Sequence, residues 1–358
     1  KVDTLGLRDY IIFYDFGRFF NLQIVLNYAF SRPKKFIKEA IKANKVNLHI
    51  QKYYKLNYWK TYFNLLSFGI SSYKLDDADI IHAHSEVLAF KFMFLSIMKN
   101  IPLVCTFHGL QPKGVNPLTN IKRKILYSKV NCVLVNTYFA KQQVETLGCP
   151  SDKILILPQG LPLEDFAFTP RPCPVNDEIL HLLSVGRFHR DKGYGYSLLA
   201  VARLLRANVG LHYHIVGVGE GKKRMQDFIN RIGISEHITI YEELKTESLH
   251  SLYQKAHLFI LASIDNKLGE HVETQGVVLQ EAQASGCIPI ASCVGGIPEC
   301  LNDRQDAILV PEKSSKAIAN AVCYLLKRPK EWKRYQENGR RNVEENFSAD
   351  VIGKKMAK

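Results

Sequence analysis

Short apolar runs alternate with helical patterns along most of the chain. Ten runs, many of them β-branched, predict strands at residues 79–84, 102–109, 131–137, 153–158, 179–186, 212–219, 238–241, 258–263, 288–292 and 307–311. Apolar positions at helical spacing predict helices between them, for example at 195–207, 222–233, 246–256 and 314–326. Strands that are nearly all apolar and alternate with helices indicate an α/β fold with parallel sheets covered on both faces.

The strand–helix alternation occurs in two series, which predicts two doubly wound domains. The break falls near residues 162–177, a proline-rich stretch with no clear period. We therefore expect one domain over residues 1–168 and a second over 169–342, followed by a terminal segment at 343–358. A ligand would bind between two such domains, at the carboxyl ends of their strands.

The first 78 residues follow a different pattern. Within a basic helical segment at 31–70, residues 31–45 place lysines at 34, 38, 42 and 45 among apolar positions, and an aromatic-rich stretch follows at 53–68. A basic amphipathic helix of this kind can lie on an anionic membrane surface. The alternative is that both helices pack on the sheet and expose a solvated lysine face, and the sequence leaves the two open.

Charge is unevenly distributed along the chain. The net charge is +14, and residues 1–168 contribute roughly 22 basic against 12 acidic side chains. This surplus favours an anionic partner for the first half, namely a membrane surface, a phosphorylated substrate or nucleic acid, although excess lysine can also serve solubility alone. No nucleic-acid motif accompanies the charge, so we expect no nucleic-acid partner.

Cysteine usage and hydropathy bear on location. The eight cysteines form no C-x-x-C pair and several lie in apolar runs, which favours reduced thiols in a cytoplasmic protein over disulfides or a zinc site. No uninterrupted apolar run approaches the roughly 18 residues of a spanning helix. There is no initiator Met, and we expect that the chain begins downstream of the true N-terminus.

Candidate chemistry begins after the strand at 179–186. In "SVGRFHRDKG", Gly186 permits a tight turn, Arg187 and Lys192 follow, and a helix is expected to begin near Gly193. Two cations at a strand–loop–helix junction, with free N–H groups at the helix start, make an anion clamp. The alternative is that Arg187 and Lys192 are exposed basic residues in an ordinary surface loop, which would produce the same sequence pattern.

The stretch "EHVETQGVVLQEAQASG" at 270–286 holds Glu273 and Glu281. On one helix the two carboxylates would lie about 80° apart, so the spacing suits a loop glutamate followed by a helix glutamate. The helix would begin near Gly276, and the backbone N–H groups of Gly276, Val277 and Val278 could bind a phosphate. An acidic face on a plain helix is the alternative.

Other motifs are less specific. The turns "VGVGEG" at 216–221 and "GGIPEC" at 295–300 are compatible with plain βα turns, although the glycines permit close backbone approach. His82, His84 and His108 stand at strand carboxyl ends, and His84 with His108 favours a site there. They have no cysteine or carboxylate at ligand spacing, so no metal is expected.

The order of "VGRFHRDKG", "HIVGVGEG", "ETQGVVLQEAQASGCIPIAS", "GGIPE" and "AILVP" resembles the family-four, retaining glycosyltransferases of GT-B fold, in particular bacterial enzymes of capsule, exopolysaccharide and lipopolysaccharide synthesis. The resemblance covers roughly residues 79–345 and implies two Rossmann-like domains facing a central cleft. The terminal residues 343–358 would then start a helix that crosses back to the first domain.

The resemblance also implies roles for individual residues. Arg187 and Lys192 would hold the donor diphosphate, together with the helix start at Gly276, Val277 and Val278. Glu273 would lie near the donor sugar and Glu281 would bind the ribose. His108 would lie near the reacting centre, with His84 lining the acceptor side. His108, Glu273, Arg187 and Lys192 are therefore the expected catalytic residues.

The implied activity is a metal-independent, retaining hexosyltransferase without cofactor, which moves a sugar from a nucleotide sugar to a saccharide or lipid-diphosphate-linked acceptor. It would work in the cytoplasm, at the inner face of the cell membrane if the basic first half binds lipid. A sugar-nucleotide epimerase, a phosphorylase or a non-catalytic GT-B partner subunit remain alternatives.

The chain departs from the family pattern at two places. Thr274 stands where a glycine or proline usually follows the first glutamate. The strand and glycine-containing loop with which the family usually begins are not recognised near the start of the chain, so that unit either precedes the given sequence or is remodelled.

Overall fold

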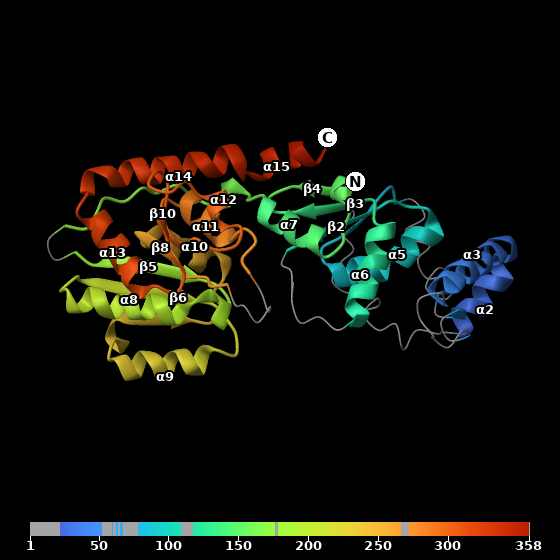
Figure 1. Cartoon of the computed structure of the whole chain (residues 1–358), viewed down its shortest axis with the longest axis horizontal. Helices are drawn as coiled ribbons and strands as arrows, with labels where there is room; N and C mark the ends of the chain where they lie inside the picture. Colours follow the sequence, from blue (N-terminus) through green and yellow to red (C-terminus); the bar gives the residue numbers. More distant parts are fainter. Residues whose placement is uncertain are drawn as a thin grey trace. The chain divides into compact units, whose positions relative to one another are not determined.

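The computed structural model describes residues 22–51, 59, 62–63, 65–66, 78–108, 117–175, 178–265 and 272–357. The chain forms two compact units. The first consists of residues 1–107, 116–134 and 148–154, and the second of residues 108–115, 135–147 and 155–358. Figure 1 shows the helices and strands of both units.

The first unit contains most of a four-stranded sheet in the order β1-β2-β3-β4. The strands are β1 (Ile81–Ala83), β2 (Leu103–Phe107), β3 (Cys132–Val135) and β4 (Ile154–Ile156), and β1 and β2 pair in parallel. The helices of this unit include α2 (Leu22–Ser31), α3 (Pro33–Gln51), α5 (Glu86–Lys99) and α6 (Pro117–Lys129). Ser85 caps the start of α5, and its side chain accepts a hydrogen bond from the Leu88 N–H.

The second unit contains a six-stranded sheet in the order β10-β9-β8-β5-β6-β7. All of its strand pairs are parallel. The strands are β5 (Leu180–Val185), β6 (Leu211–Val216), β7 (Ile238–Tyr241), β8 (Leu258–Leu261), β9 (Ile288–Ser292) and β10 (Ile308–Val310). Because β5 pairs with both β6 and β8, the strand order reverses beside β5, which is where doubly wound sheets bind their ligands.

Helices cover both faces of this sheet. The second unit contains the helices α7 (Tyr138–Thr146), α8 (Tyr194–Arg206), α9 (Lys222–Ile232), α10 (Thr246–Lys255), α11 (Val277–Ala284), α12 (Ile297–Cys300), α13 (Ser315–Leu326), α14 (Trp332–Asn346) and α15 (Ala349–Met356). Alternate residues of one strand face opposite cores. Leu182 of β5 packs in the core that includes α8 and α13, whereas Leu183 packs in the core that includes α11. The nearly all-apolar strands of the sequence follow from this two-sided burial.

The predicted α/β fold with two parallel, Rossmann-like sheets is confirmed, as are the ten predicted strands. The helix predicted at 31–45 corresponds to α3, while most of the aromatic-rich stretch 53–68 lies outside the described residues. The first strand and glycine-containing loop of the family were not recognised near the start of the chain, and residues 1–21 also lie outside the described residues. The boundaries at 168 and 342 stay predictions.

Candidate functional site

The loop after β5 is held against the loop after β6 by backbone contacts. The Phe188 N–H donates to the Val218 carbonyl at 2.8 Å, and the Gly221 N–H donates to the Phe188 carbonyl at 2.9 Å. A methyl group on Gly217 would lie 1.9 Å from the carbonyl oxygen of Gly186. The glycines of "VGVGEG" therefore allow two loops to touch, so this turn supports the neighbouring loop.

Lys192 and Glu273 form the central ion pair of the site. The Lys192 Nζ lies 2.5 Å from the Glu273 Oε2, and both side chains are nearly buried, with 13% and 12% of their surface exposed. Lys192 ends a 3-10 turn, and Gly193 follows with a left-handed φ of 63°. A methyl group on Gly193 would lie 1.9 Å from the Ala262 carbonyl, so only glycine lets this turn approach the end of β8 so closely.

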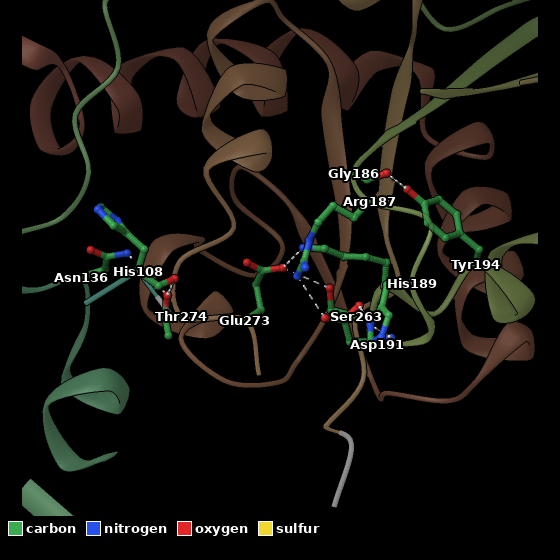
Figure 2. A network of polar contacts seen from close by, with 11 residues as sticks. His108, Asn136, Gly186, Arg187, His189, Asp191, Tyr194, Ser263, Glu273 and Thr274 are labelled. Atoms are coloured by element: carbon green, nitrogen blue, oxygen red, sulfur yellow. Dashed lines mark hydrogen bonds and ion pairs between the residues drawn. The ribbon is translucent and has the colours of Figure 1, made fainter. Parts of the chain in front are cut away.

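Arg187 has a different environment from Lys192. Its side chain is 62% exposed, and its guanidinium lies 3.6 Å from the carboxylate of Asp191. Asp191 is buried and also bonds the His189 ring at 2.7 Å. Figure 2 shows the carboxylate of Glu273 facing the side chains of the loop after β5. Of the two predicted cations, Lys192 is therefore tightly paired, and Arg187 is open to solvent.

The backbone around Glu273 is fixed by the "GGIPE" turn. The Gly296 N–H donates to the Glu273 carbonyl at 2.9 Å. A methyl group on Gly295, which has a left-handed φ of 60°, would lie 2.0 Å from that same carbonyl oxygen. On Gly296 it would lie 1.9 Å from the Thr274 carbonyl oxygen. The close backbone approach that these glycines permit is therefore used here, because the turn packs directly on the segment that carries Glu273.

Helix α11 begins where the sequence predicts it. Gly276 is the N-cap, with φ 76° and ψ 57°, and Val277 and Val278 form the first turn. The first N–H groups of a helix have no acceptor within the helix, so this turn can present donors to an anion.

Glu281 stands further along α11 with partners different from those of Glu273. Its Oε2 accepts a hydrogen bond from the buried Tyr253 hydroxyl at 2.6 Å. Burial raises the pKa of Glu281 above its ordinary value, and the Tyr253 hydrogen bond opposes this shift. The prediction of one glutamate on a loop and one on a helix is thereby confirmed.

Thr274 joins His108 to the Glu273 segment. The Thr274 hydroxyl donates to the His108 carbonyl at 3.3 Å and accepts a hydrogen bond from the Asn136 side-chain amide at 3.5 Å. The His108 side chain is exposed, whereas Asn136 and Thr274 are buried. The other predicted histidine, His84, belongs to the first unit, where its ring lies 4.3 Å from that of His82, centroid to centroid.

Two further residues were missed by the sequence analysis. The Thr137 hydroxyl donates to the Thr274 carbonyl at 2.8 Å and accepts from the Ala140 N–H at 3.2 Å. The Glu299 carboxylate accepts from the N–H groups of Tyr138 and Phe139, each at 2.7 Å. These two side chains fasten the start of α7 to the Glu273–Thr274 segment and the "GGIPE" turn. A threonine before a helix can be recognised in the sequence as an N-cap, but the sequence does not show that Thr137 also bonds the Thr274 carbonyl.

Two family models of glycosyltransferases match this chain. The family model described as "Glycosyl transferases group 1" matches residues 169–342, and the one described as "Glycosyltransferase Family 4" matches residues 25–165. The chain belongs to these glycosyltransferases. The predicted family resemblance is confirmed, and the loops after β5 and β8 lie within the group 1 domain.

Individual relatives of this glycosyltransferase agree. WcaL of Escherichia coli K12, named as a colanic acid biosynthesis glycosyltransferase, is 24% identical over 78% of this chain and 70% of its own length. The amylovoran biosynthesis glycosyltransferase AmsK of Erwinia amylovora is 25% identical over 78% of this chain and 69% of its own length.

Solved structures show the same fold. HepE of Anabaena, in a complex with UDP-glucose, superposes with a TM-score of 0.68 at 16% identity, covering 79% of each chain. The lipopolysaccharide outer core galactosyltransferase WaaB superposes with a TM-score of 0.62 at 14% identity, covering 83% of this chain and 80% of that one. The predicted GT-B fold class is confirmed. Among the described residues of this glycosyltransferase, no cluster of three or more metal-ligating side chains is found.

Proposed function

We propose that this glycosyltransferase is a retaining, metal-independent hexosyltransferase of surface polysaccharide synthesis. Its donor would be a nucleoside diphosphate sugar, and its acceptor a saccharide or a lipid-diphosphate-linked saccharide. The observation that carries the proposal is the Lys192–Glu273 pair, which joins the loops after β5 and β8 beside the point where the strand order reverses. The polysaccharide names of WcaL and AmsK and the UDP-glucose bound to HepE support the substrate classes.

Charge development explains why cations belong at this position. When the bond between the sugar and the diphosphate breaks, negative charge grows on the leaving diphosphate. The Lys192 ammonium is held nearly buried at 2.5 Å from Glu273, so it is oriented before the donor arrives. Arg187, being exposed, can swing toward the phosphates and bind them with its planar fork. Two such cations can take the place of a divalent metal, and we propose that no metal or other cofactor is needed.

The two glutamates would bind different parts of the donor. Glu273 is a hydrogen-bond acceptor beside Lys192, suited to a sugar hydroxyl close to the diphosphate. Glu281 is held by Tyr253 on α11 and would accept from the ribose hydroxyls. The helix start at Gly276, Val277 and Val278 stands between them in the chain and would bind phosphate through backbone N–H groups.

Catalytic and acceptor-side roles follow from the same placement. The bond from Thr274 to the His108 carbonyl links His108 to the Glu273 segment, which supports a role for His108 near the reacting sugar. We propose His84 for the acceptor side, and retention at the anomeric carbon, on the family resemblance alone. A cytoplasmic location is part of the proposal, and the eight free cysteines support it.

Donor binding and sugar transfer test the proposal together. A thermal-shift screen of nucleotide sugars with the full chain should identify one that raises the melting temperature, because a ligand of the folded state stabilises it. Transfer from that donor to a saccharide acceptor, followed by NMR of the product, should show a retained anomeric configuration and no loss of rate with EDTA. An inverted product or a metal requirement would overturn those two parts of the proposal.

The alternatives predict other results from the same assay. A sugar-nucleotide epimerase would convert the donor without an acceptor, and a phosphorylase would require inorganic phosphate. A non-catalytic partner subunit would show no stabilisation by any nucleotide sugar. Stabilisation by a nucleotide sugar without transfer to any saccharide would leave donor recognition standing and overturn the proposed acceptor class.

A further inference from the structure

Helix α3 has an inward face that is small and polar. Glu39, Ala43 and Asn47 follow at intervals of four residues and are all buried. The Glu39 carboxylate lies 3.9 Å from the Nζ of Lys99 at the end of α5 and 3.6 Å from the Nζ of Lys42. The single acidic residue between Leu22 and Gln51 is thus turned inward and paired.

The opposite face of α3 combines aliphatic and basic side chains. Ile37, Ile41 and Leu48 are each more than half exposed, and Lys34, Lys38 and Lys45 are exposed beside them. At about 100° per residue, these six positions fall within an arc of about 100°. The sequence left open whether this helix binds a membrane or only exposes a solvated lysine face. A solvated lysine face alone does not account for three exposed aliphatic side chains in the same arc.

Helix α2, which precedes α3 in the chain, also exposes large apolar side chains. Leu26 and Phe30, four residues apart, are 46% and 84% exposed, and α2 packs against α3. Arg32, at the junction between the two helices, is also exposed. We call Leu26, Phe30, Ile37, Ile41 and Leu48, with Lys34, Lys38 and Lys45, the basic–apolar face.

The composition of this face selects the chemistry of its partner. From Leu22 to Gln51 the sequence has six lysine or arginine residues and one glutamate, so the partner is anionic. Exposed aliphatic and aromatic side chains add nothing to binding the phosphates of a nucleic acid, but they gain free energy when they enter the interfacial region of a bilayer. No helix within the described ranges is long and apolar enough to cross a membrane.

We propose that the basic–apolar face binds the surface of an anionic lipid bilayer. The lysines contact the headgroups, and Phe30, Ile37 and Ile41 enter the boundary between headgroups and acyl chains. Together with the proposed function, this places the enzyme on the surface where a lipid-linked acceptor would reside. The inference itself does not rest on the proposed function, because it follows from the two helices alone.

Vesicle sedimentation of the full chain, without donor or acceptor, tests the proposal. The wild-type protein is expected to bind vesicles of mixed phosphatidylcholine and phosphatidylglycerol, and to bind pure phosphatidylcholine much more weakly. The variant Lys34→Glu/Lys38→Glu/Lys45→Glu should bind the mixed vesicles at least about tenfold more weakly, since each surface cation contributes roughly fivefold. The variant Ile37→Ser/Ile41→Ser should lose about as much binding although its charge is unchanged.

Matched variants on another surface separate this site from general effects. Lys330→Glu/Lys354→Glu/Lys355→Glu makes the same charge change at exposed lysines of the second unit. Val175→Ser/Ile179→Ser removes two exposed aliphatic side chains there. Both control variants should bind like the wild type, and circular dichroism should show all four variants folded.

Three results would overturn the proposal. The first is a wild-type protein that does not bind the mixed vesicles. The second is equal binding to neutral and anionic vesicles, and the third is a charge-reversal control that loses as much binding as the α3 variant. If instead the wild type self-associates and Ile37→Ser/Ile41→Ser makes it monomeric without any vesicle binding, the face is an interface between two copies of the chain. A failure of donor binding would leave the vesicle result untouched.

Discussion

The lysine at the centre of the candidate site and the lysines on the outer face of α3 have opposite environments. Lys192 in the second unit is nearly buried and lies 2.5 Å from a carboxylate on another loop. Lys34, Lys38 and Lys45 in the first unit are exposed next to aliphatic side chains. A buried, oriented charge can stabilise a transition state because it needs no reorganisation, whereas exposed charges attract a large anionic surface and are screened by salt. The difference predicts chemistry in the second unit and association in the first.

The largest effect is expected at Lys192. Lys192→Ala should lose at least about 2 kcal/mol of transition-state stabilisation, which is about 30-fold in kcat/KM, because one charge-assisted bond to the leaving diphosphate disappears. Steady-state kinetics with the identified donor would measure the loss. Lys222→Ala is the matched control, since Lys222 also pairs with a glutamate, Glu242, but at an exposed site.

The comparison between the units fails if the two variants have similar kinetics. Near wild-type turnover of Lys192→Ala would remove the assignment of Lys192 to the diphosphate. An equal loss in Lys222→Ala would show that the effect is a general one of charge.

A smaller effect is expected where the Glu273 segment is fastened. Thr137→Val removes the donor to the Thr274 carbonyl and should lower kcat about tenfold, the scale of one buried hydrogen bond, with little change in KM for the donor. Thr137→Ser keeps the hydroxyl and should restore most of the rate. Thr146→Val removes a hydroxyl bonded to a backbone carbonyl in the same helix and should leave kcat unchanged.

The split between kcat and KM distinguishes positioning from folding. A structural role alone would lower the melting temperature of Thr137→Val and leave the kcat of the folded fraction intact. That result would contradict the positioning role.

The contrast between these sites also shows what the sequence could predict. The strands at 258–261 and 288–292 were readable because burial on both faces leaves continuous apolar runs. The helix start at Gly276 was readable because a glycine precedes an apolar helical stretch. The Lys192–Glu273 contact was inferred only as two separate motifs, 81 residues apart.

The fastening residues were beyond sequence reasoning for a physical reason. Thr137 bonds a carbonyl 137 residues away, and Glu299 bonds N–H groups 160 and 161 residues away. Such bonds depend on which loops lie next to each other at the ends of strands. Neither the hydrophobic periodicity of the sequence nor local secondary-structure propensity predicts which loops become neighbours. The exposed apolar residues of α3 were visible as an amphipathic pattern, but only the structure shows which arc is outward.

A third effect is expected in donor affinity. Glu281→Ala should weaken nucleoside diphosphate binding in calorimetry by about tenfold, since the ribose hydroxyls lose a charged acceptor. Glu281→Gln keeps an acceptor oxygen and should lose less. Unchanged affinity of Glu281→Ala would count against the ribose role, and would leave Glu281 as a structural partner of Tyr253.

The smallest effect concerns the pH dependence of that affinity. Burial raises the pKa of Glu281, so the carboxylate should take up a proton, and donor affinity should fall, at a higher pH than for an exposed glutamate. Tyr253 donates to the ionised form, so Tyr253→Phe should raise the pKa of Glu281 further and move the loss of affinity to higher pH. Calorimetry of nucleoside diphosphate binding from pH 5 to 8 would show the shift. Glu281→Gln cannot ionise and should abolish this dependence, and a Tyr253→Phe profile that superposes on the wild type would show that the hydroxyl does not control the charge of Glu281.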